Sequence, residues 1–474
     1  MLVSVFFETQ GVSWVLIKNA LIADQLVDIR FSKLIEQIQA GLVALEEEVV
    51  LDAQQSEVLP GLHDHHFHFF ASLARDYSID CGPPKVNNLS DLRESLRVAR
   101  GPVKWIRGFG YHESVAGELD RFGLDEIVDD RPVRVQHRTG KMWILNSRAC
   151  ELLEIDKHCQ LDGVETDGSG KPTGRLFRLD GWLRERVREE NREFVAPFSE
   201  KLLQFGITGF TDASYTNNFE TRAYFRELES AGDIKQRLTL MGDETLEDGF
   251  LKVMLDEDRL PALDELVTRI SAAHDVGRGV AFHCVTDLEL LFALEALRSS
   301  DDHKGDRIEH AALVSPEQIK VMRELEVSVV TQPGFILAKG DQYLAEISAE
   351  DHPNLYRYKS LLDNGIMVLS SSDSPYGPIS PFEVIEAATC RETREGKVIA
   401  PEEVVSREEA ISGYLKPPNQ LRSSRRSLSV GDPADLCILD GSMSSHSKLP
   451  KDYFVRQTFV DGELCYSASS AKIS

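Results

Sequence analysis

Histidines crowd one short stretch of the chain, and their spacing suits a metal ion. Four of the thirteen histidines lie between His63 and His68, after an apolar, strand-like approach and a Pro-Gly turn. Because side chains two residues apart point the same way in a β-strand, His66 and His68 would present two imidazoles to one point. Such a pair suits a borderline metal ion such as Zn²⁺. A cluster of packed or surface histidines would show the same spacing, so the residues downstream must decide between the two interpretations.

The middle of the chain alternates between apolar, β-branched stretches and amphipathic stretches with helical spacing. The predicted strands are 133–136, 206–211, 279–283, 327–331 and 365–369. The predicted helices lie near 146–154, 217–231, 288–298, 316–325 and 381–391. This alternation predicts an α/β fold, a (β/α)8 TIM-like barrel. In such barrels the catalytic groups sit at the C-terminal ends of the strands.

Both ends of the chain read as short strands joined by turns. The N-terminal strands fall between about 13 and 57, and the C-terminal ones include a hairpin near 453–466 with Asp461-Gly462 at its turn. We therefore expect one small β-domain built from both termini. The predicted division is 1–57 and 423–474 for the two parts of that domain, with the barrel at 58–422.

Four polar residues fall where a barrel would place its active site. His283 and His310 close strand-like stretches, and Asp373 follows another. Lys252 lies in the apolar run 250–255, where an inward-pointing ammonium group needs a partner or a modification. Each of these residues also has an ordinary structural interpretation when it is taken singly. His283 could be a packed histidine and His310 part of a surface pair with Glu309. Asp373 could be a turn residue and Lys252 a solvated lysine. Taken together, in this order after the His-x-His pair, they predict a metal-dependent active site.

The same pieces resemble the amidohydrolase superfamily, and within it the amidohydrolase 3 family that includes N-substituted formamide deformylases. The matching segments span nearly the whole chain: VLPGLHDHHFH (58–68), GITGFTD (206–212), HCVTD (283–287), RIEH (307–310), SDSP (372–375) and GDPADL (431–436). The resemblance implies a metal-dependent barrel hydrolase whose small β-domain is a β-sandwich.

The resemblance also implies a role for each candidate metal ligand. His66 and His68 would bind the more buried of two divalent ions, for which Zn²⁺ is expected. His283 and His310 would hold the second ion. Lys252 would carry CO₂ as a carbamate and bridge the two ions, which removes the problem of an inward ammonium group.

The implied activity is hydrolysis of a carbon–nitrogen bond in an amide, formamide or N-acyl compound by a metal-activated hydroxide. Asp373 would contact the first ion and act as the catalytic group, taking a proton from water and passing it to the leaving amine. Two alternatives remain open. One is a heterocycle deaminase on the same barrel with a single metal ion, and the other is a non-catalytic binding or regulatory protein.

Some further residues are assigned weaker roles. His63 and His65 are expected to pack or to support the ligands, and Asp64 to orient a ligand histidine. Many relatives have a histidine where this chain has Lys141. Four residues are expected to contact the substrate: His137, Lys141, Trp143 and Asn146.

Bulk properties exclude some partners. The formal net charge of −25 argues against binding to nucleic acid or to an anionic membrane. No apolar run approaches the ~20 residues that span a bilayer, and the first residues lack the basic region of a signal peptide. The seven scattered cysteines favour reduced thiols, hence a cytoplasmic protein. A small-molecule substrate is expected. The sequence does not determine the oligomeric state, although barrels of this kind often associate into homo-oligomers.

Overall fold

The computed structural model describes residues 14–98, 105–187, 192–301, 305–418, 426–446, 448–449 and 454–468. The chain divides into two compact units, one made of 1–72 with 195–474 and the other of 73–194. The range predicted for the barrel, 58–422, includes this second unit. The predicted boundary between 422 and 423 lies outside the described residues.

The first unit contains a barrel of eight parallel strands in the order β19-β18-β17-β16-β15-β14-β13-β6. The strands are β6 (Leu62–Phe67), β13 (Ile207–Asp212), β14 (Arg237–Gly242), β15 (Phe250–Met254), β16 (Val280–Cys284), β17 (Arg307–His310), β18 (Ser328–Thr331) and β19 (Val368–Ser370). The first and last strands come together just beyond β19, where the backbone N–H of Asp373 donates to the carbonyl of His66 at 2.9 Å. The barrel is therefore nearly closed, which confirms the predicted fold class.

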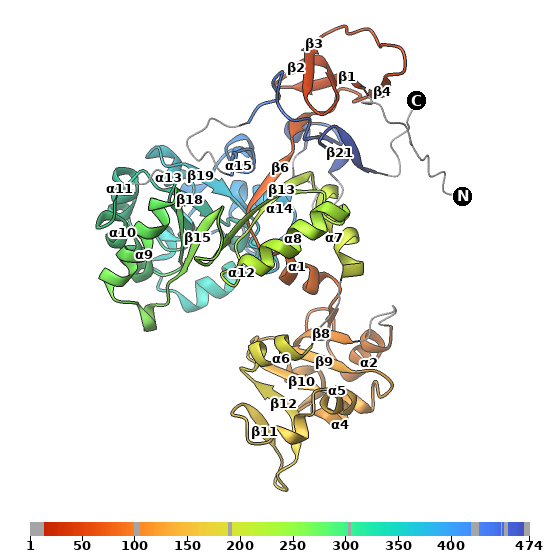
Figure 1. Cartoon of the computed structure of the whole chain (residues 1–474), viewed down its shortest axis with the longest axis vertical. Helices are drawn as coiled ribbons and strands as arrows, with labels where there is room; N and C mark the ends of the chain where they lie inside the picture. Colours follow the sequence, from red (N-terminus) through yellow and green to blue (C-terminus); the bar gives the residue numbers. More distant parts are fainter. Residues whose placement is uncertain are drawn as a thin grey trace. The chain divides into compact units, whose positions relative to one another are not determined.

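Helices follow most of the barrel strands, and α9, α10 and α11 lie beside β15 and β18 in Figure 1. Their bounds are α1 (Phe69–Asp76), α7 (Arg192–Gln204), α8 (Phe219–Ala231), α9 (Leu263–Asp275), α10 (Asp287–Arg298), α11 (Pro316–Glu324), α12 (Gly334–Glu346), α13 (Lys359–Asp363), α14 (Pro381–Cys390) and α15 (Arg407–Tyr414). Local sequence fixes several starts: α10 begins at a capping box formed by Thr286 and Glu289. Among the described helices, none has the length and apolarity needed to cross a membrane.

Alternation along the strands separates the inside of the barrel from its outside. Leu251 and Val253 of β15 join a large apolar cluster with the surrounding helices. Phe250, on the other face of the strand, belongs to a small cluster to which several strands each contribute a residue. Lys252 shares the face of Phe250. On the inward face of β15, Phe250 therefore belongs to the apolar cluster. Lys252, the one charged residue of this strand, lies two residues closer to its C-terminal end.

Strands from both ends of the chain form the predicted β-domain, shown by the red and blue segments in Figure 1. One sheet has the order β3-β2-β1-β4 and the other β22-β21-β20-β5. The strands are β1 (Val15–Ile22), β2 (Gln25–Phe31), β3 (Ile35–Gln39), β4 (Val49–Asp52), β5 (Val58–Pro60), β20 (Leu436–Leu439), β21 (Val455–Val460) and β22 (Glu463–Ser467). Residues of both sheets share one apolar cluster, and positive φ angles at Asp461 (50°) and Gly462 (77°) make the predicted hairpin turn.

The second unit is built on a six-stranded sheet with the order β11-β12-β10-β9-β8-β7. Its elements are β7 (Ile79–Asp80), α2 (Leu89–Val98), β8 (Ile106–Tyr111), α3 (Glu113–Ala116), α4 (Arg121–Asp125), β9 (Val133–His137), β10 (Met142–Leu145), α5 (Ser147–Leu152), β11 (Val164–Thr166), β12 (Pro172–Phe177) and α6 (Asp180–Arg186). The predicted strand at 133–136 therefore belongs to this sheet and not to the barrel.

Candidate metal centre

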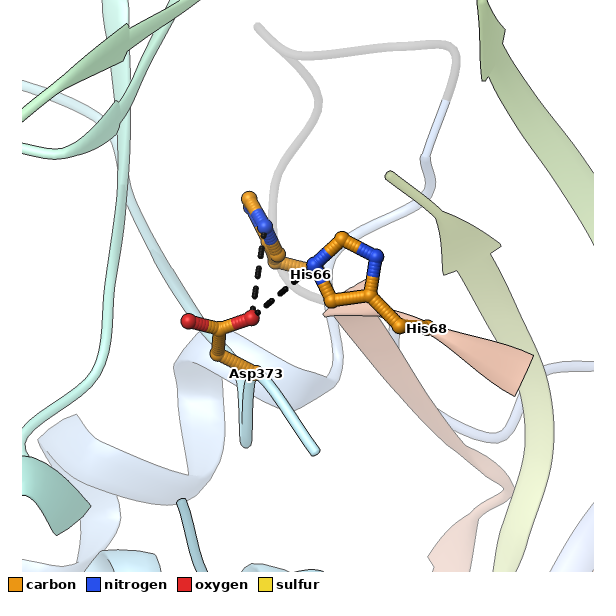
Figure 2. A group of neighbouring side chains, drawn as sticks. All are labelled: His66, His68 and Asp373. Atoms are coloured by element: carbon orange, nitrogen blue, oxygen red, sulfur yellow. Dashed lines mark ion pairs between the residues drawn. The ribbon is translucent and has the colours of Figure 1, made fainter. Parts of the chain in front are cut away.

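His66, His68 and Asp373 form the tightest group of potential ligands in the described part of the chain. One ligand atom from each lies within 4.8 Å of the others. Figure 2 shows one carboxylate oxygen of Asp373 facing a ring nitrogen of both histidines. That oxygen, Oδ1, is 3.5 Å from Nε2 of His66 and 3.2 Å from Nε2 of His68. Two imidazole nitrogens and a carboxylate around one point are a donor set that fits a divalent metal ion.

The backbone around these ligands is tied together by Asp64. Its buried carboxyl group accepts the N–H groups of His66 and Ser372, each at 3.2 Å. Burial raises the pKa of Asp64 to about 7, and its bonds to these N–H groups work against that rise. Asp373 itself has a positive φ of 50°, a conformation in which aspartate is enriched among non-glycine residues. Asp64 therefore joins the backbone at His66 to the backbone at Ser372, next to Asp373. This position agrees with the expectation that Asp64 orients a ligand histidine.

His283 and His310 form a second pair beside this group. Nδ1 of His283 and Nε2 of His310 are 2.9 Å apart. Two nitrogens bound to one zinc ion at about 2.0–2.1 Å in tetrahedral geometry would be roughly 3.3 Å apart, so this spacing suits two ligands of one ion. The His310 ring also lies 4.7 Å from that of His66, and its Nδ1 is 3.9 Å from Oδ2 of Asp373. The structure thus brings the four predicted histidine ligands and Asp373 into one cluster.

Hydrogen bonds hold three of these rings in an orientation that suits metal binding. For His66 and His310 the Nδ1 partner is an acceptor oxygen, which places the proton on Nδ1 and leaves Nε2 with its lone pair. For His68 the partner is a hydroxyl group, which can accept in the same way. The Nδ1 partners are Glu309 for His66, Gln332 for His310 at 2.9 Å and Ser214 for His68 at 2.9 Å.

The electrostatics of the cluster favour the neutral form of three imidazoles, those of His66, His283 and His310. Burial, followed by nearby positive charge, lowers the pKa of His66 and His310 well below the usual range. The same causes lower the pKa of His283 to about 4. Neutral imidazole is the form that binds metal, so these residues need no deprotonation near neutral pH.

Glu309, to which no role was assigned from the sequence, contacts the candidate ligand His66 directly. It is fully buried, accepts the Nδ1–H of His66 and is held by the guanidinium group of Arg307. Arg307 is fully buried as well and donates to the carbonyl of His65 at 2.6 Å. The available signal was the spacing: Arg307 and Glu309 are two residues apart on one strand, so both point to the same face, as the partners of an ion pair on one strand face would.

Lys252 lies within the same cluster. Its side chain is buried, and its Nζ has no hydrogen-bond partner among the described residues. Burial lowers the pKa of Lys252, and its charge in turn lowers the pKa of His66, His283 and His310. The amine therefore sits among the predicted ligands, in surroundings that disfavour its protonated form.

His63 and His65 occupy the other face of β6. Their rings lie 4.7 Å apart, and Nε2 of His63 is 2.9 Å from Oγ1 of Thr211. Gly209 makes room for this packing, since a Cβ there would come within 2.6 Å of the His63 ring. Both residues are buried away from the metal cluster.

The four expected substrate contacts all lie in the second unit. Lys141 is exposed, and His137 contacts Thr139 and Glu113. The indole N–H of Trp143 donates to Asp180 at 2.7 Å. The buried Asn146 amide bonds the backbone of Val133, Val128 and Arg131 and caps α5. These contacts describe local roles in the unit's own fold, and substrate contact by the four residues stays a prediction.

Comparison with known proteins adds independent evidence. A family model described as "Amidohydrolase family" matches residues 49–466. N-substituted formamide deformylase from Arthrobacter pascens is 27% identical over 91% of this chain and 92% of its own. Putative amidohydrolase YtcJ from Bacillus subtilis is 22% identical over 89% of this chain and 91% of its own. Among solved structures, an uncharacterized metal-dependent hydrolase from Pyrococcus furiosus aligns with a TM-score of 0.72 at 22% identity, covering 90% of this chain and 99% of its own.

The family match begins at β4 of the β-domain, and it includes all eight barrel strands and every residue of the cluster. The chain therefore belongs to the amidohydrolase family and is a hydrolase that acts on carbon–nitrogen bonds other than peptide bonds.

Proposed function

We propose that the protein hydrolyses the amide bond of small N-formyl or N-acyl compounds, using two divalent ions, with Zn²⁺ the expected metal. The observation that carries this proposal is the position of Asp373, whose Oδ1 faces Nε2 of both His66 and His68. The similarity to a protein named as an N-substituted formamide deformylase supports this choice of substrate class.

Two sets of residues would hold the ions. His66, His68 and Asp373 would bind the first, and His283 through Nδ1 and His310 through Nε2 would bind the second. Bound there, a divalent ion lowers the pKa of a water molecule and polarises a carbonyl oxygen.

Asp373 would carry the proton through the reaction. A carboxylate beside the attacking water can accept its proton and then deliver it to the nitrogen of the departing amine. The second oxygen of Asp373 lies 3.9 Å from His310, so the carboxylate is held between the two sets of ligands. Removing the ionisable group while keeping the shape of the side chain should therefore stop turnover without removing the metal.

Lys252 would carry the carbamate that joins the two ions. The neutral amine is the form that reacts with CO₂, and burial of Lys252 favours that form. The carbamate would also supply oxygen atoms where the Nζ now has no hydrogen-bond partner. In a crystal grown with metal and bicarbonate, electron density extending beyond Nζ is the expected result; a bare amine away from any ion would reject this part of the proposal.

The central test is Asp373→Asn, assayed against a panel of formamides, N-acyl amino acids, aryl amides and cyclic amides. We expect bound metal to stay at the wild-type level while kcat falls by about 10²–10⁴-fold. Asp258→Asn is a matched control, since Asp258 is exposed on the short helix 257–259. Near-normal turnover by Asp373→Asn would overturn the assigned role.

Metal analysis of the same preparations separates the open alternatives. Two ions per chain favour the amide hydrolase, whereas one ion with release of ammonia from a heterocycle favours a deaminase. A fully metal-loaded wild-type protein that cleaves nothing in the panel would favour the non-catalytic alternative.

We also propose a reducing, cytoplasmic location. All seven cysteines are free thiols, and four of them are buried. Burial raises the pKa of Cys81, Cys150 and Cys437 to about 12, which keeps these thiols protonated and unreactive. Association into a homo-oligomer stays a prediction that light scattering of the purified protein would check.

A further inference from the structure

Helix α12 carries a lysine toward the C-terminal end of the barrel strands. The helix starts shortly after β18. Its Ile336 side chain is buried in an apolar cluster, so one face of the helix packs against the rest of the unit. Phe335 and Lys339 are four residues apart and so lie on one face of the helix. The Nζ of Lys339 lies 3.9 Å from the centre of the Phe335 ring and 5.9 Å from that of Tyr376.

Tyr376 connects this lysine to the metal cluster. Its ring stands edge-on to that of His68 at 5.7 Å, and its backbone N–H donates to the carbonyl of Asp373 at 2.8 Å. Tyr376 is 58% exposed, so the space beside it is open to a ligand. Lys339 is therefore separated from a predicted metal ligand by one aromatic ring.

Within the described ranges, the ammonium group of Lys339 has no carboxylate or carbonyl partner, and aromatic faces are its contacts. Burial lowers the pKa of Lys339, while the charge of Asp373 works in the opposite direction. A cation–π contact stabilises the ammonium group of a lysine less than a charged hydrogen bond with a carboxylate does. In a chain with a net charge of −25, a local cation is also what an anionic substrate needs to approach.

We propose that Lys339 binds the carboxylate of the substrate, so that the preferred substrates are N-formyl or N-acyl α-amino acids. This inference rests on the proposed amide hydrolysis. In such substrates the α-carboxylate is attached to the carbon next to the scissile amide. When the amide is at the metal cluster, this carboxylate would lie near Lys339, which is separated from His68 by the ring of Tyr376. Tyr376 would flank the substrate between Lys339 and the metal cluster.

A matched pair of substrates tests the proposal directly. N-formylphenylalanine and N-formyl-2-phenylethylamine differ only in the carboxylate, and both enantiomers of the acid are assayed. The metal-loaded wild-type protein should prefer one enantiomer of the acid to the neutral compound by at least about tenfold in kcat/KM.

Lys339→Met keeps the apolar stem against the two rings and removes the charge. It should lower kcat/KM for the acid by about 10–100-fold, mainly through KM, and leave the neutral compound within about twofold. Lys339→Arg should restore part of the preference. Lys320→Met, at an exposed position of α11, is the control and should change neither substrate.

The possible results distinguish this inference from the proposed function. Equal losses on both substrates in Lys339→Met would assign Lys339 a purely structural role and overturn the inference. Equal wild-type rates on both substrates, unchanged in Lys339→Met, would also overturn it while leaving amide hydrolysis in place. Failure of the wild-type protein to cleave any amide in the panel would instead reject the proposed function.

Discussion

The two faces of β6 carry the same residue type in different environments. On one face, His66 is joined by His68, and the rings are held by Glu309 and Ser214 so that Nε2 of each faces Asp373. On the other face, His63 and His65 pack against each other and against the neighbouring strand. All four lie within six residues, so residue type alone does not distinguish the candidate ligands. What distinguishes His66 and His68 is the partner on Nδ1 and the carboxylate that faces Nε2.

The largest effect is expected when the rings of His66 and His68 are removed together. His66→Ala with His68→Ala should abolish binding of the first ion and lower kcat/KM by at least about 10³-fold, because the chemistry that the metal supplies is worth several kcal/mol. Metal content and activity are measured on the same samples. If the doubly substituted protein kept its metal and turnover, the assignment of His66 and His68 as metal ligands would be wrong.

Glu309 gives the next largest effect, because it acts on the metal only through His66. Glu309→Gln keeps an acceptor for the Nδ1–H but removes the charge, and metal affinity should fall by about 10–100-fold. Chelator competition at a pH where the variant is fully folded measures this. An unchanged affinity together with a lowered melting temperature would show that Glu309 serves only to neutralise the buried Arg307.

Acid should unfold the metal-free protein, and both faces of β6 contribute. His63, His65, His66 and His310 have folded-state pKa values well below 6.5, and that of His283 is about 4. Between these values and 6.5 the unfolded chain binds more protons than the folded one, so stability is present above pH 6.5 and is lost as the pH falls, by up to about 1.4 kcal/mol per pH unit for each imidazole. Asp64, with a pKa raised to about 7, opposes this trend between pH 3.8 and 7.

Urea unfolding of the metal-free protein from pH 7 to pH 5 checks the sign. Replacing His63 and His65 together with leucine should reduce the slope without changing metal affinity at pH 7. A stability that rises on acidification would contradict the assignment of neutral imidazoles.

The smallest effect is expected at His65. No side chain in the described part of the chain hydrogen-bonds either ring nitrogen of this buried residue, and the one polar contact of the ring is with the backbone of Lys416. His65→Leu therefore removes at most one weak polar contact, and stability should change by no more than about 1 kcal/mol, with kcat/KM unchanged. A large loss of activity in this variant would break the distinction between the two faces.

Some of the site could be predicted from sequence because the barrel imposes a rule on it. Once strands alternate with helices, polar residues at strand ends must meet, and His283, His310 and Asp373 follow that rule. The partners of the ligands could not be predicted in the same way. Ser214 and Gln332 follow the ends of β13 and β18 and contact His68 and His310, so their roles depend on register and barrel curvature.

The second unit escaped prediction for a related reason. Its strand β9 and helix α5 have the same local pattern as a barrel repeat, and only long-range pairing assigns them to another sheet. Local propensity reports the type of an element, whereas the sheet to which a strand belongs is decided by contacts far away in sequence.

The bonds between Asp64 and Ser372 join residues 308 positions apart. During synthesis the ribosome makes the first histidines long before it makes the aspartate that completes their site. If His66, His68 and Asp373 bind the first ion as proposed, a chain that stops short of that aspartate lacks one of the three ligands. Capture of the ion would then report that the last barrel strand has been made and lies beside the first.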